Sequence, residues 1–298
     1  MKTLDKILEG LMRRYSKRVP EVNKVTKALI KRGVIKSQKE ISNDHVAFRT
    51  MGVKQLGLKS FEKIFLHNGY VPRDDYFFEA KRLNARWYAP PEPKYPRIFI
   101  SELRVDDMPN ETQKIIYSYL DEVKSDPVEK LNLDDFKQVD TFLHEPLWRL
   151  PSWSDFKQLQ KVSEYAAWVI YNRYYLNHYT ISVHDLNIGY NTISEFNAFL
   201  ESIGIVLNDS GGEIKVSKDN LLLQSSTVSS MVEADFQEGI KKMIPGSYVE
   251  FCERKVLPQY KHLIGKQIQR KHRRDGFETG NADKIFESTY LDQTKKKK

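Results

Sequence analysis

Two histidines and two glutamates stand at matching places in two halves of the chain. His45 in NDHVAFRT and His178 in NHYTISV each follow a turn that carries asparagine or aspartate. Glu102 in FISEL lies 57 residues after the first histidine, and Glu250 in YVEFCE lies 72 residues after the second. Divalent iron binds two imidazoles and one carboxylate on one face of its coordination sphere, which leaves positions for substrate and oxygen. Three of these four side chains suffice for such a site.

The elements around these residues predict a duplicated unit that can bring them together. Each half has a strand, an amphipathic helix and three further strands, and the repeat rests on this order rather than on sequence identity. We therefore predict an α+β fold in which paired βαβββ modules form an open barrel, with added N-terminal, central and C-terminal helices. The expected parts of this single domain (1–298) are N-terminal helices (1–38), a first module (42–106), a helical connection (107–176), a second module (177–254) and a C-terminal helical lid segment with a basic tail (255–298).

Four segments, NDHVAFRT, NHYTISV, YVEFCERK and GFETGNADKIFEST, resemble the 2-oxoadipate dioxygenase/decarboxylase family of the vicinal oxygen chelate superfamily. The resemblance runs from about residue 44 to residue 290. It implies that His45, His178 and Glu250 bind Fe(II), for which Zn, Ni or Mn can substitute, and that Arg49 contacts the substrate. It also implies that a small 2-oxo acid, 2-oxoadipate, reacts with O2 to give 2-hydroxyglutarate and carbon dioxide.

Strand periodicity gives Arg49 an independent place in the expected site. His45, Ala47 and Arg49 alternate with their neighbours, so the imidazole and the guanidinium share one face of the strand. Four residues of strand span roughly 13 Å, which suits a contact with the distal carboxylate of a C5–C6 diacid. A guanidinium inside a barrel needs an anion, because burying it unpaired is costly. We expect Arg49 to be a catalytic and substrate-binding residue; a structural ion pair with Glu102 or another acid is the alternative.

A third histidine, two hydroxyl side chains and a phenylalanine also lie near the expected site in sequence. His184 shares a face with His178, but six residues of strand separate them by roughly 20 Å, so one metal cannot bind both. Ser226 and Thr227 follow a predicted strand and are expected to hydrogen-bond the substrate. Phe277 opens the C-terminal GFETGNADKIFEST segment and is expected to close over the pocket and exclude water.

Composition and charge restrict the remaining function classes. No apolar run approaches the ~20 residues of a membrane helix, and a single cysteine excludes a disulfide framework. These features predict a cytoplasmic protein without membrane or nucleic-acid partners, and they leave the oligomeric state open. From residue 254 onward, 13 Lys and Arg stand against 5 Asp and Glu, which accounts for the whole net charge of +8. A solvated helix end at QRKHRR (269–274) and a frayed lysine tail are favoured over a polyanion contact.

Two other functions remain open at this stage. A non-oxidative metal-dependent lyase, isomerase or hydrolase of the same superfamily could use the same three ligands without oxygen. A polyanion-binding protein could use the basic C-terminal segment.

Overall fold

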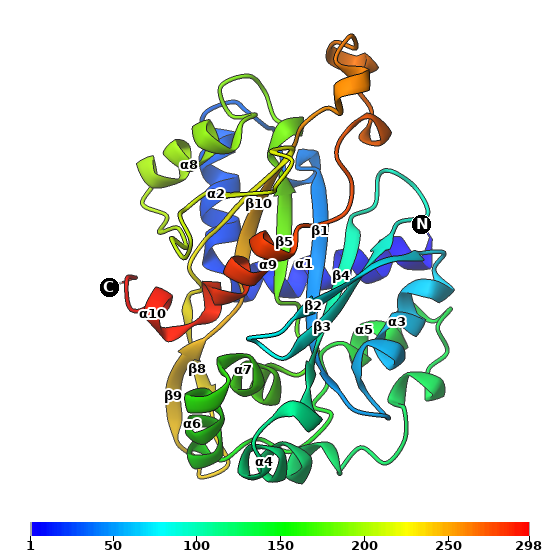
Figure 1. The fold of residues 1–298 in the computed structure, drawn as a ribbon, viewed down its shortest axis with the longest axis vertical. Helices are drawn as coiled ribbons and strands as arrows, with labels where there is room; N and C mark the ends of the chain where they lie inside the picture. Colours follow the sequence, from blue (N-terminus) through cyan, green and yellow to red (C-terminus); the bar gives the residue numbers. More distant parts are fainter. Residues whose placement is uncertain (1, 298) are drawn as a thin grey trace.

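The computed structural model describes residues 2–297 and begins with two helices that cover one face of a sheet. They are α1 (Thr3–Arg18) and α2 (Pro20–Lys31). Leu4, Ile7 and Leu11 form the buried stripe of α1. Pro20 starts α2 at a position where its missing N–H has no helical partner to lose. Figure 1 shows both helices behind the central strands.

Two βαβββ modules follow, as the sequence predicts, and together they form the mixed α+β fold. The first contains β1 (Asn43–Gly52), α3 (Gly57–His67), β2 (Val71–Phe78), β3 (Leu83–Ala89) and β4 (Arg97–Arg104). The second contains β5 (His178–Ser182), α8 (Ile193–Ser202), β6 (Lys215–Val216), β7 (Leu222–Ser226) and β10 (Tyr248–Arg254). A hairpin of β8 (Met231–Asp235) and β9 (Lys241–Pro245) interrupts the second module as a separate two-stranded sheet, which the sequence analysis missed.

The eight module strands form one sheet in the order β2-β3-β4-β1-β5-β10-β7-β6. β1 and β5 pair antiparallel at the junction of the modules, whereas β1 with β4 and β5 with β10 pair parallel. In this register Ala47 lies opposite His178, and both His45 and Glu250 lie opposite Thr180. The strands β1, β5 and β10 lie side by side (Figure 1), and this register therefore places His45, His178 and Glu250 beside one another.

A helical connection joins the modules and packs beside the junction. It contains α4 (Asn110–Leu120), α5 (Phe136–Phe142), α6 (Trp153–Val162) and α7 (Glu164–Asn172). Short 3-10 turns occur at Gln38–Glu40, Val105–Asp107, Pro127–Lys130, Val183–Asp185, Pro258–Tyr260, Gly265–Gln267, Arg270–His272 and Glu287–Thr289. No helix among residues 2–297 is long and apolar enough to cross a membrane.

The C-terminal segment crosses the face of the sheet opposite α1 and α2. It contains α9 (Thr279–Phe286) and α10 (Leu291–Thr294), and Figure 1 shows α9 in front of the central strands. The expectation of a solvated helix end at QRKHRR is wrong, because short turns there fold Arg273 and Arg274 against the body. The described part of the lysine tail is also anchored, since Lys297 pairs with Glu21.

The attachment of this segment predicts a pH-dependent stability. Glu164 accepts a hydrogen bond of 2.8 Å from the backbone N–H of Leu291, yet burial raises its pKa from 4.5 to about 7. Ionisation of Glu164 is penalised in the folded chain alone, so stability is expected to fall as the pH rises from about 4.5 to about 7. Glu164→Gln should flatten that part of the profile of thermal midpoint against pH, whereas the exposed control Glu201→Gln should leave it unchanged. Equal slopes in wild type and Glu164→Gln would contradict this assignment.

Candidate metal centre and its cavity

Three ligand-type side chains converge where the two modules meet. His45 on β1, His178 on β5 and Glu250 on β10 are all buried. Nε2 of His45 lies 3.4 Å from Nε2 of His178 and 3.4 Å from Oε1 of Glu250. Nε2 of His178 lies 3.1 Å from Oε2 of Glu250. A metal bound at about 2.1 Å by two ligands at a right angle separates them by about 3 Å. The donor types and spacings therefore fit one mononuclear metal ion with open positions.

Each histidine is oriented by the residue directly before it in the sequence. Nδ1 of His45 lies 2.8 Å from Oδ1 of Asp44, and Nδ1 of His178 lies 2.9 Å from Oδ1 of Asn177. An oxygen acceptor at Nδ1 selects the tautomer with its proton there, which leaves the lone pair of Nε2 facing the centre. The acid or amide preceding each histidine was visible in the sequence only as a turn signal.

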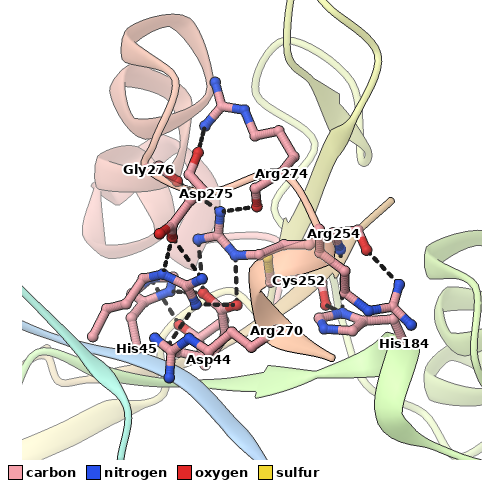
Figure 2. A network of polar contacts seen from close by, with 12 residues as sticks. Asp44, His45, His184, Cys252, Arg254, Arg270, Arg274, Asp275 and Gly276 are labelled. Atoms are coloured by element: carbon pink, nitrogen blue, oxygen red, sulfur yellow. Dashed lines mark hydrogen bonds and ion pairs between the residues drawn. The ribbon is translucent and has the colours of Figure 1, made fainter. Parts of the chain in front are cut away.

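Asp44 is itself anchored by two buried arginines, drawn with its network in Figure 2. Arg254 contacts both carboxylate oxygens, at 2.6 and 2.9 Å, and Arg97 contacts one of them at 3.1 Å. Although burial opposes ionisation, these two guanidinium groups hold the pKa of Asp44 well below its usual range. His45 therefore donates to a fixed, ionised carboxylate. Arg254 was missed, although alternation along β10 places it on the same face as Glu250.

Glu250 is held by a second chain of contacts that reaches the C-terminal segment. Nε2 of Gln224 donates to Oε1 of Glu250 at 2.7 Å, and Nδ2 of Asn281 donates to Oε1 of Gln224 at 3.0 Å. Although burial opposes ionisation, His45 and His178 hold the pKa of Glu250 well below its usual range. The carboxylate is thus ionised and oriented. Neither Gln224 nor Asn281 was predicted, because their contact depends on tertiary packing of α9 on β7.

Arg49 lies in the same cavity and has no carboxylate partner among the described residues. Its side chain is only 1% exposed, and its two Nη atoms donate to Oγ1 of Thr289 and to the backbone oxygen of Phe286, each at 3.0 Å. The alternative ion pair with Glu102 is not present, because Glu102 accepts from the backbone N–H of Leu58. The cavity is lined by Arg49 together with all three ligand-type side chains.

Three buried polar atoms facing this cavity have no hydrogen-bond partner. They are Nε of Arg49, Nδ2 of Asn177 and the hydroxyl of Tyr248. Burial raises the pKa of Tyr248, so its hydroxyl remains protonated and can donate. Because an unpaired buried donor costs about 1–3 kcal/mol, a cluster of three beside the centre indicates a space suited to an oxygen-rich anion.

Aromatic side chains close the opposite wall of the cavity. Phe277 is buried, and its ring centroid lies 4.8 Å from that of His45 and 4.9 Å from that of Phe99. Arg254 donates to the backbone oxygen of Gly276, whose φ of +68° suits glycine, and thereby fixes the turn that delivers Phe277. Phe277 thus stands beside the candidate ligands, where the sequence analysis expected it.

The other predicted residues lie away from the cavity. The hydroxyl of Ser226 contacts Oγ of Ser288 at 2.8 Å, and Oγ1 of Thr227 accepts from the backbone N–H of Val249 at 3.2 Å. Neither is among the residues that line the cavity, so a substrate contact by Ser226 or Thr227 needs a rearrangement. His184 follows β5 and contacts the backbone of Arg254, outside the three-residue group.

Comparison with known proteins places this geometry in a family context. The family model described as 2-oxoadipate dioxygenase/decarboxylase matches residues 7–266. The chloroplastic 2-oxoadipate dioxygenase/decarboxylase of Arabidopsis thaliana is 46% identical over 265 residues, which cover 85% of this chain and 70% of that protein. The chloroplastic/amyloplastic protein of that name from Oryza sativa subsp. japonica is 46% identical over 263 residues, with the same coverage.

A solved structure extends the similarity to the fold. The crystal structure of hydroxyglutarate synthase from Oryza sativa in complex with 2-oxoadipate matches with a TM-score of 0.87 and 42% identity. The match covers 97% of this chain and 92% of that chain.

The expectation of a cytoplasmic protein is wrong on this comparison. Both plant relatives are named for the chloroplast, one of them also for the amyloplast. Net charge, hydropathy and cysteine content describe how a folded chain behaves in water. They do not distinguish one aqueous compartment from another, so they gave no support for the cytoplasm over the chloroplast.

Proposed function

Because the chain belongs to the 2-oxoadipate dioxygenase/decarboxylase family, we propose that it uses Fe(II) and O2 to decarboxylate and hydroxylate a 2-oxo dicarboxylic acid. The expected conversion is 2-oxoadipate to 2-hydroxyglutarate with release of carbon dioxide. One observation carries this proposal for the chain itself. A buried pair of histidines and a glutamate share a cavity with Arg49, a buried arginine that has no carboxylate partner among residues 2–297.

The proposed metal ligands are His45, His178 and Glu250. Iron bound there supplies the oxidation chemistry through its open coordination positions, and Zn, Ni or Mn can occupy the same donors. Asp44 and Asn177 hold the two imidazoles in the tautomer that presents Nε2, and Gln224 orients the carboxylate. These contacts pre-organise the site and exclude alternative rotamers.

Arg49 is the proposed contact for the substrate carboxylate remote from the 2-oxo group. Its guanidinium is fixed by Thr289 and Phe286, and Nε remains free to donate. The protonated Tyr248 hydroxyl and the amide of Asn177 supply two further donors within the cavity. A substrate held at both ends keeps one orientation, and Phe277 excludes bulk water beside His45.

Oxygen consumption across a series of 2-oxo acids tests this function. Protein loaded anaerobically with Fe(II) should consume one O2 and release one carbon dioxide per 2-oxoadipate, and should respond weakly to the monocarboxylate 2-oxohexanoate. Metal analysis of the same sample reports the bound ion. Substrate turnover without oxygen uptake would instead identify a lyase, isomerase or hydrolase.

Gln224 provides a prediction about metal affinity. Gln224→Leu removes the donor to Glu250 and leaves Asn281 without its acceptor, so we expect Fe(II) affinity to fall by about 10–100-fold. Anaerobic titration with Fe(II) measures the change. The exposed control Gln158→Leu should bind metal like the wild type. An unchanged Fe(II) affinity in Gln224→Leu would show that the hydrogen bond from Gln224 to Glu250 does not contribute to metal binding.

A further inference from the structure

A second cavity lies behind Asp44, at the end of the sheet that faces residues 268–273. It has polar walls from the starts of β1 and β4 and from the ends of β5 and β10. It shares no lining residue with the cavity around His45. Its cationic lining residues, called the arginine pocket below, are Lys94, Arg97, Arg254, Arg270 and Arg273.

Two of these arginines are neutralised within the protein. Arg254 and Arg97 both contact Asp44, and Arg97 also contacts Asp275 at 2.6 Å. Two guanidinium groups thus face two carboxylates, and this part of the wall carries no surplus charge. Figure 2 shows Arg254 beside Asp44, which in turn contacts His45.

Arg270 has no such compensation. Its Nη1 donates to the backbone oxygens of Pro93 and Tyr95, at 3.0 and 2.7 Å, and its buried Nη2 has no hydrogen-bond partner. No carboxylate lies within ion-pair distance among residues 2–297. Burial and the nearby Arg97 lower the pKa of Arg270 to about 10. The folded chain therefore holds a partly desolvated cation whose donor is directed at no protein group.

Two further cations face the same space. Arg273 donates to the backbone oxygen of Arg254 at 2.7 Å and also has no carboxylate within ion-pair distance in the described chain. Lys94 is largely exposed and lies 3.5 Å from Glu92. Asp185 is the remaining acid of the lining, so Arg270 and Arg273, the two cations without a carboxylate partner in the described chain, face one anion.

His184 adds a neutral donor to this wall. Burial lowers its pKa to about 4, so the imidazole is uncharged near neutral pH. Its Nδ1 lies 3.2 Å from the backbone nitrogen of Arg254 and 3.3 Å from the backbone oxygen of Cys252. A polar, concave space with a surplus positive charge and an unpaired N–H group on Arg270 suits a small anion.

We propose that the arginine pocket binds a small phosphate-bearing ligand, either inorganic phosphate or a phosphate monoester, at a site separate from the metal centre. Arg270 and Arg273 are the principal contacts, because guanidinium groups bind phosphate oxygens through paired N–H donors. Lys94 at the rim adds a third positive charge. The site is enclosed by Asp44, Ser182 and His184 on its inner side, which favours a small ligand over a nucleic-acid strand.

Calorimetric titration of inorganic phosphate into the metal-free chain tests this proposal. We expect one phosphate per chain and at least tenfold weaker binding by Arg270→Gln/Arg273→Gln. The matched variant Lys266→Gln/Lys271→Gln removes two charges from exposed residues of the same segment and should bind phosphate within twofold of wild type. Glucose 6-phosphate in a parallel titration distinguishes a phosphate monoester from the free ion.

Three results would overturn the proposal. The first is absence of phosphate binding to wild type, and the second is an equal loss in both double variants, which would indicate general charge attraction. The third is displacement of phosphate by 2-oxoadipate, which would place the anion at Arg49. If Arg270→Gln/Arg273→Gln fails to fold, Lys94→Ala replaces it in the titration. The side chain of Lys94 is exposed, so it lines the pocket without contributing to the core. Unchanged phosphate affinity in Lys94→Ala would then contradict the proposed site.

Discussion

Replacing His178 with alanine is expected to abolish Fe(II) binding and, with it, substrate-dependent oxygen uptake. His178 supplies one of three buried donors, and its removal leaves one imidazole and one carboxylate 3.4 Å apart. Contacts outside the coordination sphere already change metal affinity by about 10–100-fold, so loss of a ligand should exceed that range. Anaerobic titration with Fe(II), together with the metal-to-protein ratio of the purified chain, measures the effect without relying on turnover.

The matched control is His67→Ala, which removes an imidazole from the exposed end of α3. The partner of His67 is Asp134, which is not part of the metal centre. It should retain wild-type metal content and oxygen uptake. His178→Ala is also expected to remain folded, because the buried Glu250 keeps His45 and Gln224 as partners. Stoichiometric iron in a folded His178→Ala protein would refute the proposed ligand set.

Replacing Arg49 with methionine is expected to raise KM for 2-oxoadipate by more than about 100-fold, since removing one partner of a buried ion pair costs about 3–5 kcal/mol. The substrate-free protein should behave differently. Arg49 has no carboxylate partner among the described residues, so an apolar side chain of similar length should leave the thermal midpoint unchanged or raise it. The backbone oxygen of Phe286 keeps a donor in the hydroxyl of Thr289, at 3.3 Å.

Two comparisons separate a substrate contact from a structural arginine. Activity toward 2-oxohexanoate, which lacks the distal carboxylate, should be similar in wild type and Arg49→Met. Arg49→Lys should recover only part of the affinity, because an ammonium cannot form the paired contact of a guanidinium. A lowered thermal midpoint with an unchanged KM would assign Arg49 to the fold instead.

The sequence predicted the paired modules because both halves keep the same order of a strand, an amphipathic helix and three further strands. The first module matches the prediction element by element, and β5, α8, β6, β7 and β10 match it in the second. Alternation along β1 also placed Arg49 on the face of His45, and the cavity contains both residues. These successes rest on local periodicity, which a single sequence carries.

The contacts that support the site were not predictable in the same way. Asn281 reaches Gln224 across 57 positions, and Arg254 reaches Asp44 across 210. The first depends on how α9 packs over the sheet, and the second on how β1 and β10 flank β5. No local pattern specifies either arrangement. Ser226 was predicted to bind the substrate through its hydroxyl, but that hydroxyl contacts Oγ of Ser288 in the C-terminal segment. The hairpin of β8 and β9 was not predicted; its two strands have five residues each and are largely exposed, so they carry little apolar signal.

The placement of the ligands on both sides of the β1–β5 junction has a consequence for the amount of enzyme in a cell. A metal that joins His45 to His178 and Glu250 cross-links the two modules and binds the folded chain but not the unfolded one. At a free concentration of 100 times its dissociation constant, such a ligand adds about 2.7 kcal/mol to the stability. If that metal is scarce, more of the chain is exposed to degradation, so the abundance of the protein, as well as its turnover rate, is expected to follow the supply of the metal.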